Sequence, residues 1–535
     1  MTGYNVFLDD RALAEAAGRW TTSEATDELS TLGRIAGSSR AQEWGETANR
    51  FPPELRTHDR YGHRIDEVSF HPSYHNLLRL AVRSGIAGGA WAEPVPGAHT
   101  ARAAALVVWS QVDAGHTCPA SMTYAAVPAL RADPELAAFW EPLLTSRTYD
   151  PGLRPPGSKR GVLAGMAMTE KQGGSDVRAT LTTAVPLADD TYAITGHKWF
   201  CSAPMNDVFL VLAQAPGGLT CFVVPRVLPD GTRNTFRLQR LKDKLGNRSN
   251  ASAEVEFENT VGRRLGDEGR GIATIVEMIA VTRLDCVLGT AAGMRLATAN
   301  ALHHAAHRQV FGRAVIEQPL ARNVLADLAV ESEAATILGM RLAATLDAPA
   351  GQSRARDPAT ERALRRIGTA IGKYHVCKRG PGHAAEALEC LGGNGYVEES
   401  GMPRIFRESP LNSLWEGTGN VNALDALRAM RREPGCVEAF TAEIDAAAGA
   451  DRRLDAAAFA LRKDLTGADE SSARRIVERM ALLLQGALLV QYGHPAVADA
   501  FCASRLAGDW GRAYGTLPAG LDLASILDRA RPKIG

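Results

Sequence analysis

The chain has 535 residues, which is too long for one ordinary hydrophobic core and implies about three or four domains. Its composition is that of a globular protein, with 45% hydrophobic and 22% charged residues. Lysine plus arginine and aspartate plus glutamate each number 60, so the whole chain has no global field that would attract a polyanionic partner.

Signals for secretion, membrane insertion and metal binding are missing from the sequence. Asp9 and Asp10 stand where a signal peptide needs a basic start followed by an apolar run. The longest apolar stretch, at 481–490, is far shorter than a membrane span. The eight cysteines are scattered without a Cys-x-x-Cys pair, which in so large a chain indicates reduced, buried thiols. We expect a cytoplasmic protein with no membrane partner, no disulfide framework and no metal ion.

The N-terminal third is expected to be mostly helical. Residues 1–50 predict an irregular arm with short helical pieces. Residues 52–70, dense in proline, histidine and charge, predict a long ordered loop that enters a helix near Ser73. From there to about Leu144 the apolar spacing is mostly helical, and a cluster of proline and glycine at 151–161 marks a domain boundary.

Short segments rich in valine, phenylalanine and threonine follow over about 161–262 and predict a β-domain. Ala-Pro-Gly-Gly at 215–218 is typical of a hairpin connection between two of these strands. From Gly269 the pattern is helical again, with one helix of many turns, two or three further helices before Gly435, and a separate helical block after it.

The predicted fold is therefore multidomain α+β and mostly α. We expect an N-terminal arm and helical domain over 1–160 and a central β-domain over 161–265. A helical bundle over 266–435 and a C-terminal helical extension over 436–535 are expected to follow.

Two candidate segments for cofactor binding belong to the β-domain. In 168–176, two adjacent glycines before Ser-Asp would let the backbone approach a flat or phosphorylated ligand, although Gly-Gly-Ser-Asp is also a common turn. In 196–202, Trp199 and Phe200 beside a hydroxyl could stack on a ring cofactor. The alternative is a strand whose aromatic residues alternate between core and surface.

Two more candidate segments belong to the second helical part. Arg308, before Gln-Val-Phe-Gly, and the glycine-rich turn at 391–396 are what a diphosphate needs, although the latter is also an ordinary helix stop. In 413–420, Glu416 lies between a tryptophan and a glycine turn, where apolar shielding would raise its pKa toward that of a useful general base. By itself, an isolated glutamate is more often a solvated surface group.

These segments together, in this order over roughly residues 70–435, resemble the motifs of the acyl-CoA dehydrogenase superfamily. The N-terminal arm, the run His71–His75, the stretch 242–252 and the C-terminal helical extension are similar to its AidB branch. This resemblance implies that FAD is the cofactor. It also implies an association with the response to DNA alkylation and the binding of double-stranded DNA through the C-terminal region.

The resemblance assigns roles to individual residues. Thr169 and Ser175 would hydrogen-bond the flavin and its phosphates, and Phe200 keeps a stacking face where common members have tryptophan. Glu389 departs from the glutamine that many members carry, which places an extra negative charge near the diphosphate. Arg308 matches an arginine that reaches the FAD of a neighbouring subunit, which implies a homo-oligomer, expected to be a tetramer. The residues assigned to FAD binding are Met166, Ala167, Met168, Thr169, Gly174, Ser175, Phe200, Cys201, Ser202, Arg308, Leu414, Trp415, Gly417, Thr418, Gly419 and Asn420.

Glu416 takes the place of the catalytic base in this comparison. It would remove the α-proton of an acyl thioester while hydrogen bonds stabilise the developing enolate, and the β-hydrogen would leave as hydride to flavin N5. Members without a glutamate at this point carry it on the long helix, where this chain has Thr282, so Glu416 is the remaining candidate.

Three functions remain open from the sequence. The first is FAD-dependent dehydrogenation of an acyl thioester or a related flavin oxidation. The second adds duplex DNA binding. The charge of the 436–535 extension argues against it, because this segment has 12 basic and 13 acidic residues whereas a DNA-binding module is expected to be basic. Local arginine clusters at 428–432 and 474–479 answer that objection only in part, and Arg428 matches a residue implicated in DNA contact in the AidB branch. In the third, the fold is recruited to specialised metabolism and oxidises an amine or a carrier-bound substrate without binding DNA.

Overall fold

The computed structural model describes residues 1–347, 357–433 and 435–534 of the chain. These residues form two compact units. The first unit comprises residues 1–39, 95–111 and 283–535, and the second comprises residues 40–94 and 112–282. None of the described helices is long and apolar enough to cross a membrane.

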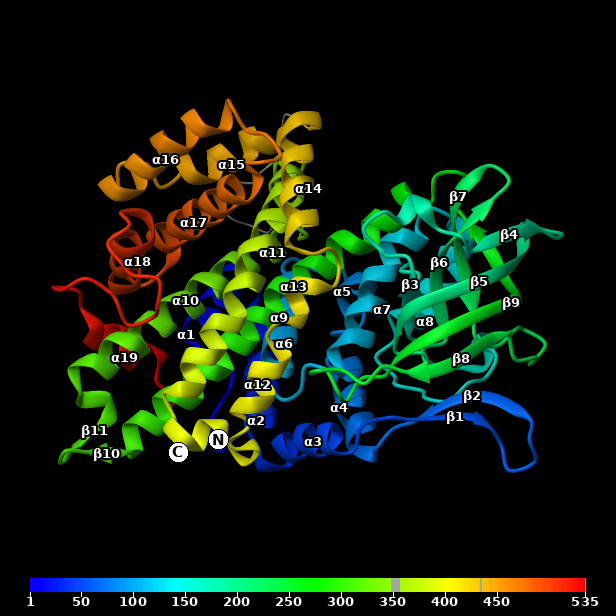
Figure 1. Ribbon diagram of the computed structural model, residues 1–535, viewed down its shortest axis with the longest axis horizontal. Helices are drawn as coiled ribbons and strands as arrows, with labels where there is room; N and C mark the ends of the chain where they lie inside the picture. Colours follow the sequence, from blue (N-terminus) through cyan, green and yellow to red (C-terminus); the bar gives the residue numbers. More distant parts are fainter. Residues whose placement is uncertain (348–356, 434, 535) are drawn as a thin grey trace. The chain divides into compact units, whose positions relative to one another are not determined.

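The second unit combines short helices with a β-barrel (Figure 1). Its helices are α3 (Ser39–Arg50), α4 (Pro72–Arg83), α5 (Gly89–Ala92), α7 (Thr117–Leu130) and α8 (Pro134–Leu144), with short turns at η1 (Pro156–Ser158) and η2 (Val177–Ala179). Its strands are β1 (Glu54–His58), β2 (Arg64–Ser69), β3 (Ala164–Ala167), β4 (Thr183–Pro186), β5 (Thr191–Ser202), β6 (Val208–Ala215), β7 (Gly218–Pro225), β8 (Phe236–Leu241) and β9 (Ser252–Leu265).

Strands β3 to β9 form one seven-stranded sheet in the order β3-β6-β4-β5-β9-β7, with β8 on β9. Because β7 also pairs with β6, the sheet closes into a barrel around a core that includes Ile194, Phe209 and Phe222. Strands β6 and β7 pair along their whole length from Ala215 and Gly218 outward. The hairpin predicted at 215–218 is thereby confirmed.

Two N-terminal expectations were wrong in detail. Residues 52–70, expected to be a loop, form the antiparallel hairpin β1–β2. In β1 the polar Glu54, Arg56 and His58 are exposed, and in β2 the buried positions are Asp66 and Val68, so the two strands carry too few apolar residues to give a clear alternation. Residues 1–50 form three regular helices, of which α1 (Arg11–Trp20) and α2 (Ser23–Ala36) are capped by the side chains of Asp10 and Thr22. These caps are local signals that could have been recognised.

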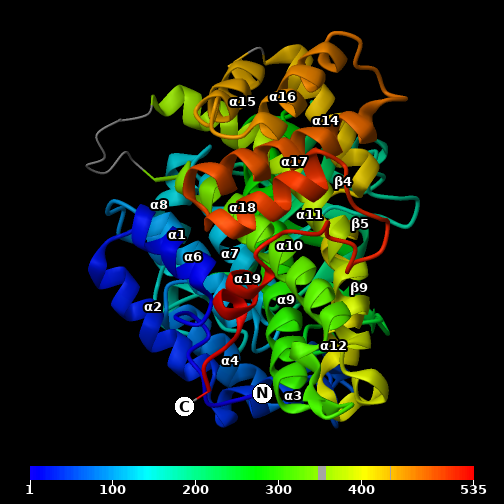
Figure 2. The same ribbon diagram turned by 90° about the vertical axis from the view of Figure 1, so that its left-hand side faces the viewer.

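The first unit is helical (Figures 1 and 2). Besides α1 and α2 it contains α6 (Ala98–Ser110), α10 (Pro319–Ala344), α11 (Pro358–Glu389), α12 (Met402–Glu408), α13 (Leu411–Leu414), α14 (Gly419–Arg432), α15 (Gly435–Asp445), α16 (Arg452–Leu465), α17 (Ala473–Tyr492), α18 (Pro495–Phe501) and α19 (Leu523–Ala530). The long helix α9 (Gly271–His307) precedes the short pair β10 (Gln309–Val310) and β11 (Arg313–Ala314). The remaining turns are η3 (Val315–Glu317), η4 (Gly392–Tyr396), η5 (Glu398–Ser400) and a π-turn η6 (Cys502–Leu506).

Among the described residues between Gly269 and Gly435, five helices follow α9, where two or three were expected. The additional ones are α12 and α13, which have seven and four residues and are too short to produce an apolar period.

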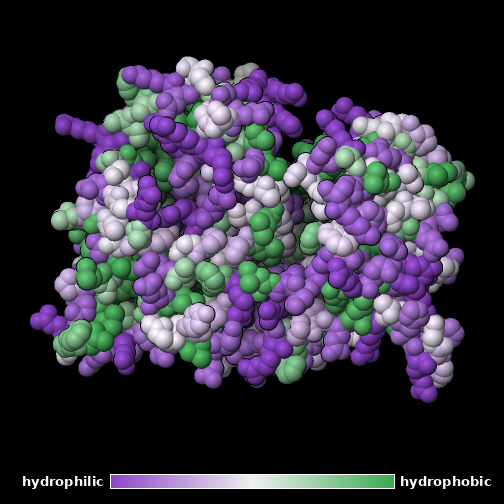
Figure 3. Space-filling view, viewed as in Figure 1, coloured by the Kyte–Doolittle hydropathy of each residue, from purple (hydrophilic) through white to green (hydrophobic). Residues whose placement is uncertain are grey.

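Buried arginines hold the C-terminal extension against the rest of the first unit. Arg505, in the π-turn, pairs with Asp327 and with Glu331 of α10, the latter at 3.0 Å. Arg529 of α19 pairs with Glu333 of α10 at 3.0 Å and with Glu15 of α1 at 2.6 Å. Figure 3 shows that the surface over α15 to α18 is mainly hydrophilic on the side in view, so the apolar faces of these helices are turned inward.

A fully buried ion pair joins the first two sequence motifs inside the second unit. The Nζ atom of Lys198 on β5 lies 2.8 Å from the Glu170 carboxylate and donates to the Leu212 carbonyl of β6 at 2.8 Å. Glu170 also accepts from the Thr182 hydroxyl at 2.6 Å and the Leu181 N–H at 2.7 Å. Burial alone would raise the pKa of Glu170, but these hydrogen bonds, with that from Lys198 the strongest, lower it to about 2.

We predict that Glu170→Gln destabilises the β-domain, because Lys198 loses its counter-charge. The expected loss in the free energy of unfolding at pH 7 is about 3–5 kcal/mol. The pKa of Glu170 is lowered on folding, so its contribution to stability is complete above pH about 4.5 and declines as the pH falls toward 2. Urea unfolding at pH 7 and at pH 3 measures both effects.

The matched control is Glu258→Gln, which breaks an exposed pair with Arg237. That change should cost less than about 1 kcal/mol. Equal losses for the two variants would contradict the buried-pair interpretation.

Candidate active site

In the second unit, the predicted site residues lie where β3 and β5 end. The backbone N–H of Trp199 donates to the Thr169 carbonyl at 2.8 Å, so the structure brings the segments 168–176 and 196–202 together. A Cβ at Gly174 would lie 2.5 Å from the Thr169 hydroxyl oxygen. The glycine therefore lets the loop approach Thr169 closely.

These residues differ in how far their side chains are exposed to solvent. The Phe200 side chain is 54% exposed, and Ser175 is also exposed. The Ser202 hydroxyl is half-buried and lies 3.2 Å from that of Ser252. Met166, Ala167 and Cys201 are buried in the barrel, so only their backbone could contact a ligand.

In the first unit, Glu416 lies in a turn with left-handed backbone, with φ of 58° at Glu416 and 98° at Gly417. Such a conformation costs a non-glycine residue about 1–3 kcal/mol when the surroundings must impose it. Two cations impose it here. Lys373 of α11, whose side chain is buried, donates to the carbonyls of Trp415 at 2.7 Å and Gly417 at 2.5 Å, and Arg283 of α9 donates to that of Glu416 at 2.9 Å.

The surroundings of this turn are also ordered. Arg283 pairs with Asp425 of α14 at 2.7 Å. Burial would raise the pKa of Asp425, but Arg283 and Arg366 lower it overall. The Glu416 charge acts on the Cys286 thiol of α9, whose pKa lies well above its usual value, chiefly because the thiol is buried.

Trp415 is fixed by a chain of hydrogen bonds. Its indole N–H donates to the Asn412 side-chain oxygen at 2.9 Å, and the Asn412 amide donates to the Thr290 hydroxyl of α9 at 3.1 Å. The indole is half-buried beside Glu416. The orientation of the tryptophan is therefore set through α9, one of the two helices that hold the turn.

Directly after the turn, α14 begins with an exposed helix start. Thr418 occupies the N-cap position, but its side chain makes no capping hydrogen bond. Thr418 and Asn420 are exposed, whereas Gly419 is buried. The first N–H groups of α14 therefore retain capacity for an external acceptor.

The remaining predicted residues lie on the surface of the first unit. Arg308 is exposed at the end of α9, just before the β10–β11 hairpin, whose tip carries Phe311 at 99% exposure. The glycine-rich turn at 391–396 ends in Tyr396, which is 85% exposed. Glu389 is an exposed residue in the last turn of α11.

Sequence reasoning missed Lys373 and Arg283 as supports of the Glu416 turn, and it did not pair Lys198 with Glu170. One signal was available. Lys373 is a single lysine in the otherwise uncharged run 367–377, nearly all of which is buried. A lysine in such a helix must find buried acceptors, which here are the carbonyls of the turn.

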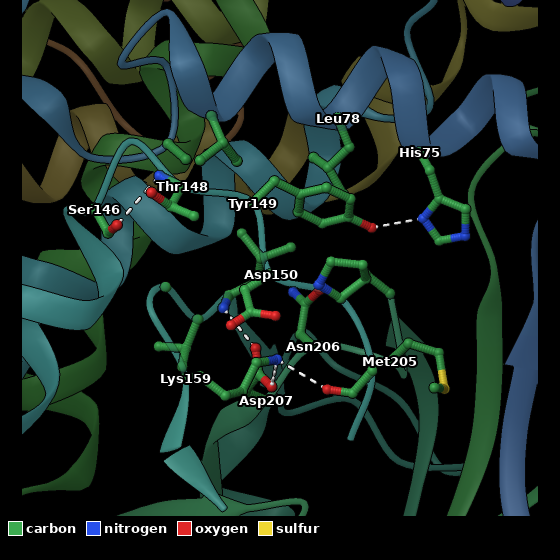
Figure 4. Close-up of a pocket in the computed structure, with 18 of the residues that line it drawn as sticks. His75, Leu78, Ser146, Thr148, Tyr149, Asp150, Lys159, Met205, Asn206 and Asp207 are labelled. Atoms are coloured by element: carbon green, nitrogen blue, oxygen red, sulfur yellow. Dashed lines mark hydrogen bonds and ion pairs between the residues drawn. The ribbon is translucent and has the colours of Figure 1, made fainter. Parts of the chain in front are cut away.

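A small cavity of about 70 Å³ lies in the second unit among α4, the segment 144–163 and the loop after β5 (Figure 4). The Tyr149 hydroxyl is 2.7 Å from Nδ1 of His75, and burial lowers the pKa of this histidine. Lys159 in the wall pairs with Asp207. The cavity is thus charge-compensated, and none of the predicted site residues lines it.

Comparisons with known proteins place this geometry in a family. Residues 1–151 match the family model of the adaptive response protein AidB N-terminal domain. Residues 165–260 and 269–430 match the middle and C-terminal domains of acyl-CoA dehydrogenases. AidB of Escherichia coli strain K12 is 45% identical over 500 residues, which cover 93% of this chain and 91% of AidB.

The chain belongs to the AidB branch of the acyl-CoA dehydrogenase family. Among solved structures, Caenorhabditis elegans ACDH-11 in complex with C11-CoA is similar with a TM-score of 0.87 and 27% identity, covering 94% of this chain and 92% of that one. An acyl-CoA dehydrogenase from Bacillus anthracis complexed with FAD has the same fold, with a TM-score of 0.65 at 18% identity, covering 96% of this chain and 86% of that one. Membership makes the chain an oxidoreductase that acts on CH–CH bonds and indicates FAD as its cofactor.

We predict that Lys373→Met loosens the turn at Glu416. The change keeps the length of the side chain but removes the donors to two buried carbonyls, so the free energy of unfolding should fall by about 1–3 kcal/mol. Amide hydrogen exchange of residues 415–418 should become faster by a larger factor than that of distant segments.

Arg362→Met, an exposed change on the same helix α11, is the control. If both variants exchange at the same rate over 415–418, Lys373 does not hold the turn.

Proposed function

We propose that this protein oxidises acyl-CoA thioesters with FAD and that Glu416 is the base that removes the α-proton. The observation that carries this proposal is the strained turn at Glu416. Its three consecutive carbonyls are bound by Lys373 and Arg283, so the backbone that carries the carboxylate cannot relax. A strained residue held by buried cations is typical of a catalytic position.

The chemistry follows from this placement. Glu416 accepts the proton from the carbon next to the thioester, and hydrogen bonds to the thioester oxygen stabilise the developing negative charge. Bound FAD would supply the hydride acceptor for the neighbouring carbon, so that the substrate would gain a carbon–carbon double bond. CoA as the handle is supported by the C11-CoA complex of ACDH-11.

The described residues fit FAD in two places. In the second unit, Phe200 offers an exposed aromatic face, and the hydroxyls of Thr169, Ser175 and Ser202 offer hydrogen bonds. In the first unit, the uncapped start of α14 offers backbone N–H groups to a phosphate, with Thr418 and Asn420 beside them. The backbone of Met166, Ala167, Met168, Gly174, Cys201, Leu414, Gly417 and Gly419 would complete these surfaces.

We also propose a homotetramer in which Arg308 contacts the FAD of a neighbouring subunit. The exposed hairpin after Arg308 supports this role, because an aromatic tip such as Phe311 is expected to be covered by another chain.

Glu416→Gln is the decisive variant for the catalytic proposal. It keeps the shape of the side chain and removes the base, so flavin reduction by a competent acyl-CoA should slow by about 10²–10⁴-fold. The FAD content should barely change. Anaerobic stopped-flow reduction with linear and branched acyl-CoAs measures this effect, and Glu438→Gln, at an exposed position on α15, is the control.

Reduction of Glu416→Gln at the wild-type rate would identify another group as the base. If no acyl-CoA reduces the wild type but an amine or a carrier-bound substrate does, the recruited-fold alternative replaces the proposal.

Duplex DNA binding is a second proposed function, located at Arg428. This arginine is exposed on α14, one turn before the exposed Arg431 and Arg432. In contrast, Arg479 of α17 is paired with Asp464. Because Arg428 precedes the 436–535 extension, the nearly neutral charge of that extension does not weigh against a contact at Arg428.

If Arg428 contacts phosphates, Arg428→Ala should weaken duplex binding and lower the slope of log affinity against log salt by about one. Arg11→Ala, at an exposed position on α1, should leave the slope unchanged. Fluorescence anisotropy of a labelled duplex at several salt concentrations provides the slopes. An affinity that does not change with salt concentration, or an unchanged slope in Arg428→Ala, would contradict DNA binding at this position.

A further inference from the structure

The side-chain amide of Asn422, in the first turn of α14, binds the turn that carries Glu416. Its Nδ2 atom donates to the Gly417 carbonyl at 2.6 Å and to the Thr418 carbonyl at 3.0 Å. These are the two residues that directly follow Glu416, and the Asn422 side chain is fully buried. A polar side chain that the function has not yet used thus contacts the backbone beside the proposed base.

Neither carbonyl needs this amide in order to be hydrogen-bonded. The Gly417 carbonyl also accepts from Nζ of Lys373 at 2.5 Å. The Thr418 carbonyl also accepts from the backbone N–H of Asn422 at 3.0 Å, as the first hydrogen bond of the helix. Buried amides ordinarily serve to satisfy such carbonyls, but this purpose does not account for Asn422.

The amide also lowers stability through its oxygen. The Oδ1 atom of Asn422 is buried and has no hydrogen-bond partner among the residues that the structure describes. The reverse orientation of the amide would direct Oδ1 at two carbonyl oxygens, which can only accept, so the orientation with Nδ2 at the carbonyls is the favourable one. An apolar side chain would avoid the loss that an unpartnered buried acceptor causes. Asn422 is therefore explained by what its donors do at the turn.

The turn itself is tightly enclosed. Glu416 and Gly417 have left-handed backbone, with φ of 58° and 98°. A Cβ on Gly417 would lie 2.9 Å from Cγ1 of Val421. It would also lie 3.2 Å from a terminal nitrogen of Arg283 and 3.3 Å from Nδ2 of Asn422. The peptide at Gly417 cannot rotate without displacing these side chains, because close-packed atoms leave no room for it.

Two donors from different helices meet on one oxygen of this turn. Lys373 of α11 and Asn422 of α14 both donate to the Gly417 carbonyl, which has two lone pairs and uses both. A single donor leaves a carbonyl free to swing about the hydrogen bond, whereas two donors from separate directions fix the plane of the peptide. The second donor therefore adds orientation to the turn.

We propose that Asn422 is a positioning residue for Glu416, because its amide and Lys373 together fix the peptide plane at Gly417 and with it the direction of the carboxylate. This inference rests on the proposed role of Glu416 as the base, and it adds a residue that acts only through that base. A displacement of reacting atoms by about 1 Å can lower a rate by about 10²-fold, so a small rotation of the turn is enough to matter.

The test measures flavin reduction in Asn422→Leu, which keeps the branched shape of the side chain and removes its donors. Each full-length holoprotein is mixed anaerobically with the acyl-CoA that reduces the wild type fastest, chosen from linear and branched acyl-CoAs. The limiting rate should fall about 10- to 100-fold. The Kd of the acyl-CoA should change by less than about threefold, because the buried Asn422 side chain does not contact a bound ligand.

The same change in the Glu416→Gln background separates positioning from general structural damage. Asn422→Leu should alter the residual rate of Glu416→Gln by less than about twofold, because no base is left to position. Asn422→Gln keeps the amide donors and should recover part of the wild-type rate. Equal decreases in both backgrounds, or a wild-type rate in Asn422→Leu, would overturn the inference.

Gln485→Leu is the matched control. Gln485 is buried on α17, and its Oε1 atom likewise has no hydrogen-bond partner within the described part of the chain. This variant should reduce its flavin within about twofold of the wild-type rate. The melting temperature of each holoprotein shows whether a variant folds, and Asn422→Ala replaces Asn422→Leu in both backgrounds if the latter does not.

The outcomes also separate this inference from the proposed function. A wild type that no acyl-CoA reduces, or a Glu416→Gln variant that reacts at the wild-type rate, would refute the proposed function itself. A slow Glu416→Gln variant beside an Asn422→Leu variant as fast as the wild type would overturn only the role of Asn422.

Discussion

Two cations bind three consecutive backbone carbonyls, and the structure around Glu416 depends on this constraint. Lys373 of α11 and Arg283 of α9 hold the turn at Glu416, and Asp425 of α14 binds Arg283 in return. Three helices that are distant in sequence are therefore tied at one strained turn. These contacts fix the backbone from which the Glu416 carboxylate, the proposed base, extends.

In the barrel, too, a buried lysine binds a backbone carbonyl. Lys198 is buried between β5 and β6 and donates to a strand carbonyl as well as to Glu170. In both units a buried lysine satisfies backbone oxygens that secondary structure leaves open, because a lysine without such partners could not be buried. The two positions differ in their counter-charge. Lys198 has a carboxylate in contact, whereas Lys373 binds carbonyls of a turn that carries a carboxylate at its centre.

The C-terminal extension is part of the helical first unit. Arg505 and Arg529 anchor it to α10 and α1 through ion pairs with Glu331, Glu333 and Glu15, and α17 packs on α11. Its total charge is a poor guide to what it binds, because several of its cations, Arg453, Arg462, Arg479, Arg505 and Arg529, are engaged in internal ion pairs. The location of individual cations matters more, since electrostatic attraction to a phosphate acts over a few ångströms.

The amino-acid sequence by itself determined the family, the mostly helical α+β fold, the hairpin at 215–218 and the acyl-CoA dehydrogenase class of the enzyme. Those features depend on local patterns, such as apolar periodicity, turn residues and ordered motifs, that are legible along the chain. The sequence did not reveal the β1–β2 hairpin, because its many polar residues are also typical of a loop. The assignment of Glu416 as the base remains a prediction that the geometry supports. Only the tertiary structure decided that Lys373 and Arg283 hold its turn and that Lys198 pairs with Glu170. In each case the partners lie far apart in sequence, and folding alone brings their charges within hydrogen-bonding or electrostatic range.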